Sequence, residues 1–398
     1  MLIEIHMLQN YAPSNLNRDE TGSPKDCVFG GVRRGRISSQ SLKRSIRRSE
    51  IFQTAFSTGL LGIRTRRLPE EVGKILVANK ISDELVNIAK GKVTGFGNKD
   101  GKENADGITA QVMFLSKQDI QSVANVLQQI IKECDFDVKK FKAVKTVEIQ
   151  KRAELKGYRP ITPDIALFGR MITSPAFEDI QASMQVAHAI STHSLKREFD
   201  YYTAVDDLNA CAQTDAEEKD DIAGAGMIGD VEYNSSLYYK YYSLDVDGIK
   251  SNLMGLADSN RAKNITEEDK EAAEELVKKT IDTFLTAAVF ASPTGKQNSF
   301  AAHQLPEAIL IEIRPKKVPV SYANAFLKPI KATYNADLMD NSIAALQSHV
   351  ELLTHKFSLP TIARLCFSTR TFNIKGADIC ETFDELVEKV NTAISSGE

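Results

Sequence analysis

Basic side chains near the amino end of the chain are the residues best suited to binding phosphate. The segment from Cys27 to Ser49 holds seven Arg or Lys residues and no acid, whereas the whole chain has a formal net charge of −3. Guanidinium and ammonium groups bind phosphate through charge-assisted hydrogen bonds. A local anion site is therefore expected in a chain that is slightly acidic as a whole. The seven residues are Arg33, Arg34, Arg36, Lys43, Arg44, Arg47 and Arg48.

Helical spacing gathers part of this charge on one face. An alternating run at 32–37 predicts a strand after the pair Gly30-Gly31, and Ser38 or Ser39 is expected to cap the helix that follows. Anions are stabilised at a helix N-terminus by its free N–H groups and its dipole. We interpret the helix as a phosphate site, with a solvated basic helix as the alternative. Positions i, i+3, i+4 and i+7 form one face of this helix, and they are occupied by Gln40, Lys43, Arg44 and Arg47.

Length and composition set the class of protein. A chain of 398 residues can bury a large core, and we expect two or three domains or one elaborated domain. The five cysteines are scattered and form no Cys-x-x-Cys pair, which predicts reduced thiols rather than a disulfide or zinc framework. No apolar run is long enough to span a membrane and no signal peptide is recognisable, so the sequence predicts a cytoplasmic protein.

The remaining periodicity predicts a mixture of helices and strands. A strand is expected at 2–9, and 50–157 is expected to be mostly helical. Strand signals return at 164–172 and later, and 206–232 is a long irregular stretch between two predicted strands. Such a stretch is typical of a projecting arm rather than a linker. Strands separated by helices and insertions predict the α+β fold class.

Several enzyme signatures fail on spacing. The stretch 292–299, SPTGKQNS, contains a Gly-Lys pair, but Phe290 stands where a phosphate-binding loop needs its first glycine. His188 and His193 are five residues apart, a spacing that does not suit a shared metal. No nucleophile motif of the Gly-x-Ser-x-Gly type is present. The sequence therefore predicts no catalytic residue, no metal and no cofactor.

Two further groups have both a chemical and a structural interpretation. The adjacent carboxylates of Asp206 and Asp207 could hold Mg²⁺, although such a pair more often ends a strand. The tyrosines at 238, 239, 241 and 242 could stack on bases. Core packing and the strand preference of tyrosine explain them more simply.

The segment 16–47, which contains VFGGVRRGRISSQSLKRSIR, closely resembles the CasC family, the backbone subunit of the type I-E CRISPR surveillance complex Cascade. Further stretches resemble that family in the same order along the chain. They are ALFGRMITS at Ala166, MQVAHAISTH at Met184, YTAVDDL at Tyr202, KQNSFAA at Lys296 and SYANAF at Ser321.

The resemblance implies a fold shaped like a right hand. Its palm, 1–50 and 160–398, would be a modified RNA-recognition (ferredoxin-like) fold. Residues 51–159 would form helical fingers inserted into the palm, and 206–232 would form a thumb arm within it. The acidic run 215–221 cannot lie against phosphate and must face solvent or another subunit.

The resemblance also implies RNA-binding residues. Arg18 and Lys25 match basic positions of the loop before the FGG phrase. Met227 and Ile228 fall where the thumb tip should be. Val32 stands where relatives often carry a basic residue. The full set of expected RNA-binding residues is Arg18, Lys25, Ser38, Gln40, Lys43, Arg44, Arg47, Arg170, Met171, Met227 and Ile228.

The function implied by the resemblance is a non-catalytic scaffold. Such subunits bind the backbone of CRISPR RNA (crRNA), stack head to tail with copies of themselves and other Cascade subunits, and present the guide to target DNA. One alternative is a metal-dependent ribonuclease like the backbone subunits of type III complexes, with Asp26 as the candidate aspartate. Another is a sequence-specific RNA-binding protein.

Overall fold

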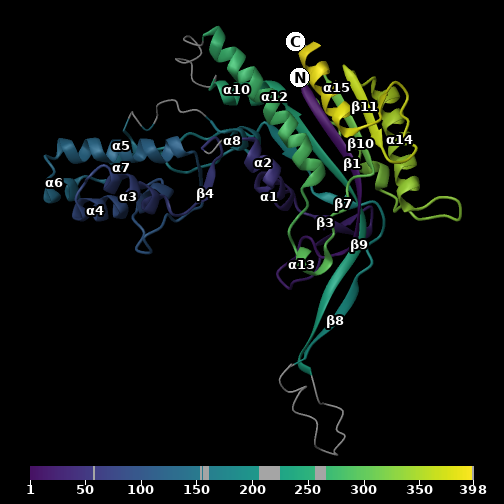
Figure 1. The fold of residues 1–398 in the computed structure, drawn as a ribbon, viewed down its shortest axis with the longest axis horizontal. Helices are drawn as coiled ribbons and strands as arrows, with labels where there is room; N and C mark the ends of the chain where they lie inside the picture. The colour runs from purple at the N-terminus through teal and green to yellow at the C-terminus, as the bar shows by residue number, and fades with distance from the viewer. Residues whose placement is uncertain (57–58, 153–154, 156–160, 206–224, 256–265, 397–398) are drawn as a thin grey trace, which may run out of the picture. The chain divides into compact units, whose positions relative to one another are not determined.

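The computed structural model describes residues 1–398 except 57–58, 153–154, 156–160, 206–224, 256–265 and 397–398 (Figure 1). These residues divide into two compact units. The sheet unit comprises Met1–Ile46, Val186–Ser243 and Ala288–Glu398. The helical unit comprises Arg47–Gln185 and Leu244–Ala287. The helical unit thus takes in segments at 161–185 and 244–287 besides the fingers expected at 51–159.

The strands of the described residues form one large sheet and one small one. The large sheet has the order β12-β11-β10-β1-β9-β7-β3-β2, with β6 and β8 also paired to β9, and β4 pairs with β5 separately. The strands are β1 (Leu2–Ser14), β2 (Asp26–Phe29), β3 (Val32–Ile37), β4 (Ile63–Thr65), β5 (Met113–Leu115), β6 (Met184–Val186), β7 (Ala189–Ser191), β8 (Glu198–Val205), β9 (Ala225–Asp245), β10 (Ala308–Arg314), β11 (Ala363–Ser368) and β12 (Asp378–Cys380).

Helices alternate with these strands along the chain. The α-helices are α1 (Ser39–Arg48), α2 (Glu50–Ala55), α3 (Leu68–Ala78), α4 (Asp83–Thr94), α5 (Lys117–Glu133), α6 (Val138–Ala143), α7 (Thr146–Gln150), α8 (Pro163–Phe168), α10 (Val246–Met254), α12 (Glu267–Phe290), α13 (Gln297–Phe300), α14 (Leu338–Phe357) and α15 (Phe383–Ser396). Short 3-10 helices are η1 (Gly95–Gly97) and η3 (Ala323–Phe326).

Strand β1 is buried on both faces of the large sheet. Leu8 on one face belongs to an apolar cluster with Ile343 of α14. On the other face Phe383 of α15 packs against Phe367 of β11, with ring centroids 6.5 Å apart. Because helices cover both faces, the polar residues that alternate along β1 are buried as well.

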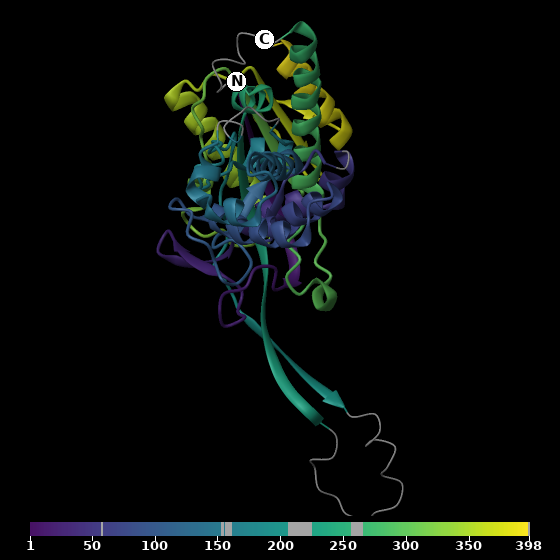
Figure 2. The same cartoon turned by 90° about the vertical axis from the view of Figure 1, so that its left-hand side faces the viewer.

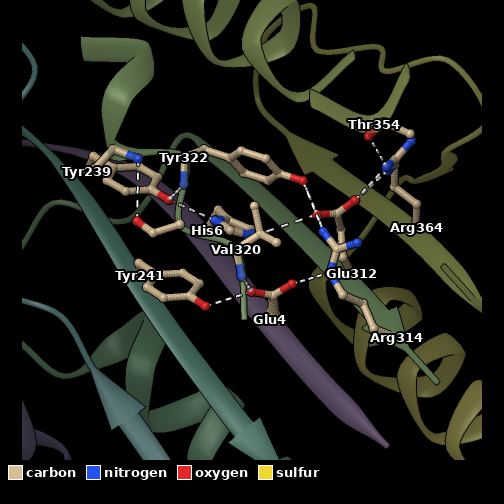
Figure 3. A network of polar contacts seen from close by, with 12 residues as sticks. Glu4, His6, Tyr239, Tyr241, Glu312, Arg314, Val320, Tyr322, Thr354 and Arg364 are labelled. Carbon is tan, nitrogen blue, oxygen red and sulfur yellow. Dashed lines mark hydrogen bonds and ion pairs between the residues drawn. The ribbon is translucent and has the colours of Figure 1, made fainter. Parts of the chain in front are cut away.

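A network of buried charges lies on the α14 face of the sheet (Figure 3). The carboxylate of Glu312 is 2.7 Å from the guanidinium of Arg314 and 2.6 Å from that of Arg364. It also accepts a hydrogen bond of 2.6 Å from the hydroxyl of Tyr322. Burial acts to raise the pKa of Glu312, but the neighbouring cations outweigh it and hold this pKa below its usual value. The carboxylate is therefore charged and stabilised by its partners.

Glu4 and His6 extend this network along β1. Glu4 accepts hydrogen bonds from the hydroxyl of Tyr241 and the backbone N–H of Val320, both at 2.6 Å, and it pairs with Arg314. The Nδ1 atom of His6 is 2.8 Å from the hydroxyl of Tyr239. Burial is the main cause that lowers the pKa of His6 to about 3. His6 is thus a neutral structural residue of the core.

A tight hairpin joins β2 to β3 through two glycines. Phe29 pairs with Val32, so that Gly30 and Gly31 form the loop, with φ angles of +61° and +75°. Positive φ at both loop residues is the geometry that matches the twist of a two-residue hairpin and favours glycine. A Cβ atom on Gly30 would lie 2.0 Å from the carbonyl oxygen of Leu327, whereas one on Gly31 would meet nothing within 4 Å.

The two glycines provide a matched pair of substitutions. Gly31→Ala should cost only the backbone strain of positive φ, about 1–2 kcal/mol of unfolding free energy. Gly30→Ala should cost roughly 2 kcal/mol more, because the new methyl group overlaps the carbonyl of Leu327. Urea unfolding of both variants measures the difference. Equal losses would show that the contact with Leu327 is not tight.

The helical unit has its own apolar core, formed mainly by α3, α4 and α5. Ser116 and Asp119 form the capping box at the start of α5, with the Ser116 hydroxyl accepting from the Asp119 N–H at 3.0 Å. The prediction of a strand at 164–172 is wrong, because this segment contains α8 instead. A short apolar run cannot be assigned from periodicity alone, and Pro163 at the first turn suits a helix start.

A long hairpin of β8 and β9 extends away from the large sheet (Figures 1 and 2). The thumb arm expected at 206–232 falls partly on this hairpin, at 225–232 of β9. Residues 206–224, including Asp206, Asp207 and the acidic run 215–221, lie outside the described residues.

Three expectations from composition can be compared with the described part of the chain. Cys27, Cys134, Cys366 and Cys380 are free thiols there. None of its helices is long and apolar enough to cross a membrane. Within the same residues, His, Cys, Asp and Glu side chains do not gather in a group of three that could hold a metal ion.

Candidate nucleic-acid interface

Helix α1 begins where the sequence predicts, directly after Ser38. The Ser38 hydroxyl accepts from the N–H of Ser41 at 3.3 Å, and its carbonyl accepts from the N–H of Leu42 at 3.1 Å. Leu42 and Ile46 are each 2% exposed, so the apolar side of the helix is buried as expected. The first turn contains no acidic residue. The N-terminus of α1 can therefore attract an anion.

The polar face of α1 is exposed to different extents along its length. Gln40 and Arg44 are exposed, and Lys43 is half-buried. Ser38 is buried, which fits its contact with the backbone of the first turn. The part of this face available to a ligand therefore extends from Gln40 to Arg44, since Arg47 beyond it is largely buried.

The loop before β2 is tied to the start of α1 through Asn17. Its side-chain oxygen accepts from the N–H of Ser38 at 2.8 Å, and its carbonyl accepts from the N–H of Lys25 at 2.8 Å. Arg18, next to Asn17, is exposed, and Lys25 is half-buried. The structure thus brings Arg18 and Lys25 to the N-terminus of α1. Sequence reasoning missed Asn17, which carries no charge or motif.

Arg36 adds to the positive charge at this end of the sheet and lies beside His188. The guanidinium of Arg36 is 3.2 Å from Nδ1 of His188, and the backbone N–H of Arg36 donates to the carbonyl of Lys25 at 2.9 Å. Burial, followed by the charges of Arg36 and Lys25, lowers the pKa of His188. His188 is exposed, so a bound anion could reach it.

The pKa of His188 should rise when RNA binds. A phosphate near Lys25 and Arg36 would offset their charge and raise the pKa of His188, so that binding takes up a proton. Affinity should then increase as the pH falls below about 6.5, the usual His value. An NMR titration of His188 with and without RNA measures this shift, and His188→Gln should remove it. An unchanged pKa would place the RNA away from this histidine.

Arg47 is held within the helical unit. Its side chain is only 14% exposed, and Nη1 lies 3.8 Å from the carboxylate of Asp164. Asp164 also accepts from the N–H of Gly62 at 2.9 Å and from the hydroxyl of Thr162 at 2.7 Å. Burial raises the pKa of Asp164, and these contacts oppose the shift. Arg47 therefore stabilises this part of the chain, and its expected contact with RNA stays a prediction.

Arg170 is likewise buried, at 8% exposure, which makes direct contact between its side chain and RNA unfavourable. Its guanidinium is 2.8 Å from the Asp119 carboxylate and donates to the Glu178 carbonyl at 3.0 Å. The next residue, Met171, is 88% exposed. Arg170 thus anchors the turn that presents Met171 to solvent.

The expected thumb-tip residues lie in β9. Met227 pairs with Ala204 of β8, and Ile228 pairs with Thr203. Their side chains are not described. The tyrosines at 238, 239, 241 and 242 are all buried, which confirms that they pack in the core rather than on bases.

Arg34, with Arg314, is one of the two largest fully buried side chains of the described residues. It donates to the carbonyls of Ser191 and Thr192 at 3.1 and 2.8 Å, and to those of Phe326 and Leu327 at 2.8 and 3.2 Å. Its role is to join β3 to β7 and η3. Two sequence phrases, GGVRRGR and SYANAF, therefore meet in the fold.

A family model described as CT1975-like protein matches residues 3–389. The chain belongs to the CT1975-like family. No curated protein matches it.

Two solved structures are similar to the chain in fold. One is a chain of a "CRISPR RNA-guided surveillance complex, pre-nicking", with a TM-score of 0.78 and 24% identity over 99% of this chain and 100% of that one. The other belongs to a "CRISPR RNA-guided surveillance complex", with a TM-score of 0.69 and 19% identity over the same shares. The helices and strands of the described residues confirm the predicted α+β class, and the first likeness is consistent with the modified RNA-recognition palm.

Proposed function

We propose that this chain is a non-catalytic crRNA-binding backbone subunit of a CRISPR surveillance complex, of the type I-E Cascade kind. The observation that carries the proposal is the basic character of α1 and the loop tied to it. The first turn of α1 contains no acid, Arg44 lies exposed further along its polar face, and the loop that carries Arg18 and Lys25 is hydrogen-bonded to the start of α1 through Asn17. Membership of the CT1975-like family and the fold shared with chains of surveillance complexes support it.

The proposed mechanism depends on contacts that ignore base identity. Phosphate and sugar contacts fix the position of a nucleic acid but carry no sequence information. A subunit that uses only such contacts can hold any guide and leave its bases free to pair with target DNA, as in other RNA-guided systems. Copies of the chain would stack head to tail along the guide in the cytoplasm and end against other Cascade subunits, as part of antiviral defence.

The ribonuclease alternative requires Asp26 to be available for a metal ion. The Asp26 carboxylate is 2.7 Å from the guanidinium of Arg197 and 3.3 Å from that of Arg33. Two guanidinium groups at this distance neutralise the carboxylate and compete with a cation for its oxygens. This arrangement favours a structural role for Asp26.

The experiment that tests the proposal compares RNAs of unrelated sequence. Binding should be equal for all of them, and with about four neutralised phosphates the slope of log affinity against log salt should be roughly −3. Incubation of bound RNA with Mg²⁺ should leave it intact. Cleavage that Asp26→Ala abolishes would favour the ribonuclease, and affinity that changes with sequence would favour a sequence-specific RNA-binding protein.

A further inference from the structure

The stretch 292–301, which we call the strained loop, has an unusual backbone. Two of its residues, Lys296 and Ala301, adopt left-handed angles, with φ of +50° and +46°. Residues with a side chain rarely adopt this conformation, and the strain that it stores is typical of functional sites. The loop contains the phrase KQNSFAA and includes α13, which lies at the end of the sheet from which the β8–β9 hairpin extends (Figures 1 and 2).

Contacts within the loop and with its neighbours hold this backbone in place. The side-chain amide of Gln297 donates to the carbonyls of Pro293 and Ala302, at 3.1 and 3.0 Å, and so closes the loop. Phe300 packs against Tyr233 of β9, with ring centroids 5.6 Å apart. A strained conformation persists only where such contacts maintain it. The shape of the loop is therefore set before any ligand binds.

The strained loop packs directly on the segment that carries Arg18. A Cβ atom on Gly295 would lie 2.3 Å from the carbonyl oxygen of Leu16, so the backbones approach each other as closely as glycine allows. Asn17, which follows Leu16, accepts from the N–H of Ser38 at 2.8 Å. One short segment of backbone thus connects the strained loop to the start of α1.

Lys296 brings a further positive charge to this place. Its side chain is half-buried, and its carbonyl accepts from the N–H groups of Ser299 and Phe300, both at 3.0 Å. These bonds use the backbone and do not involve the ammonium group. Glycine adopts left-handed angles without strain, so the backbone alone does not account for a lysine at this position. The side chain is the feature that requires an explanation.

Acids close to this place in the sequence are engaged or exposed. Asp19 accepts from the N–H and hydroxyl of its own turn, at 2.9 and 2.7 Å. Glu232, next to the tyrosine that Phe300 contacts, pairs with Arg197 at 3.2 Å. Glu20 is exposed, where water and salt screen its charge. Residues 291–306 contain no acid, so the strained loop itself is purely basic.

We propose that Lys296 binds a phosphate of the guide RNA beside the phosphate bound at the start of α1. Arg18 and Lys296, on the two chain segments that meet at Leu16, would extend the cationic surface of α1 along the RNA backbone. A loop that is ordered before binding loses little conformational freedom, which favours affinity. The inference rests on the proposed function, because it adds a contact to the same RNA site.

Three single substitutions in the full chain separate binding from folding. Lys296→Gly removes the ammonium group and also relieves the left-handed strain. Ala301→Gly is the matched control, because it relieves the same kind of strain and leaves the charge unchanged. Lys296→Arg keeps the charge. Thermal unfolding measures the melting temperature, and fluorescence anisotropy measures affinity for several unrelated single-stranded RNAs at different salt concentrations.

Lys296→Gly should raise the melting temperature by about 1–2 °C and weaken binding of every RNA by about tenfold. The slope of log affinity against log salt should become less steep by about 0.7, since one phosphate is no longer neutralised. Ala301→Gly should raise the melting temperature in the same way and leave affinity unchanged. Lys296→Arg should bind like the wild-type chain, because both cations bind phosphate.

Unchanged affinity of Lys296→Gly would overturn the proposal. A lower melting temperature of this variant would also do so, since the side chain would then serve the fold. An equal loss of affinity in Ala301→Gly would assign the effect to the shape of the loop instead of the ammonium group. If Lys43→Ala with Arg44→Ala weakens binding and Lys296→Gly does not, only this inference fails. If the wild-type chain binds no RNA, the proposed function fails with it.

Discussion

Replacement of Lys43 and Arg44 by alanine should weaken binding of every RNA sequence by on the order of 10²-fold. Hydrogen bonds to charged groups contribute about 1.5–3 kcal/mol each, and the proposal assigns one phosphate contact to each of these two side chains on the polar face of α1. The slope of log affinity against log salt should become less steep by about 1.4, since two phosphates are no longer neutralised. Fluorescence anisotropy with several unrelated RNAs at different salt concentrations measures both effects.

The matched control for this pair removes two charges elsewhere. Lys316→Ala with Lys356→Ala changes the net charge equally, and both lysines are exposed outside α1. This control should change affinity by less than about threefold, because exposed charges beyond a Debye length are screened. Arg47 is left out of the variant because it contacts Asp164, so its loss would also affect the fold. Equal effects of variant and control would mean that α1 does not bind the backbone.

Local elements were predictable because their signals lie within a few residues. The alternating run at 32–37 became β3, and the Ser116–Asp119 capping box starts α5. Such features depend on backbone bonds between near neighbours in sequence. The division of the chain into units was harder to predict, since it depends on which distant segments pack together. The segment 164–172 was predicted wrongly for another reason: its short apolar run suits a strand as well as a helix, and the structure forms α8 there.

The sequence did not show which individual arginines are buried against protein partners and which are exposed. Arg34, Arg47 and Arg170 all belong to basic or family-like phrases, yet each is buried or largely buried against partners far away in the sequence. A charge in a sequence indicates a possible ligand for phosphate and equally a possible ligand for a carboxylate or a carbonyl group. Only the fold shows which of these partners lies within reach. The candidate site is accordingly smaller than the basic segment that predicted it.

Replacement of Glu312 by alanine should be among the most destabilising single changes in the sheet unit. It would leave Arg314 and Arg364 buried without the carboxylate that lies 2.7 and 2.6 Å from them. Breaking a buried ion pair from one side costs about 3–5 kcal/mol. Thermal unfolding followed by tyrosine fluorescence measures the loss. Glu312→Gln, which keeps the shape and part of the hydrogen bonding, should lose less than Glu312→Ala.

The control for this prediction is an exposed ion pair in the same unit. Lys389 lies 2.9 Å from Glu385 on α15, and exposed ion pairs on a helix contribute little to stability because water screens them. The large difference expected between Glu312→Ala and Lys389→Ala arises from burial, since water can replace a lost partner only at the surface. Because Glu312 joins β10 to β11 and to Tyr322 just before η3, its loss should also loosen the segment that Arg34 holds. Losses of similar size in the two variants would show that water reaches the Glu312 site.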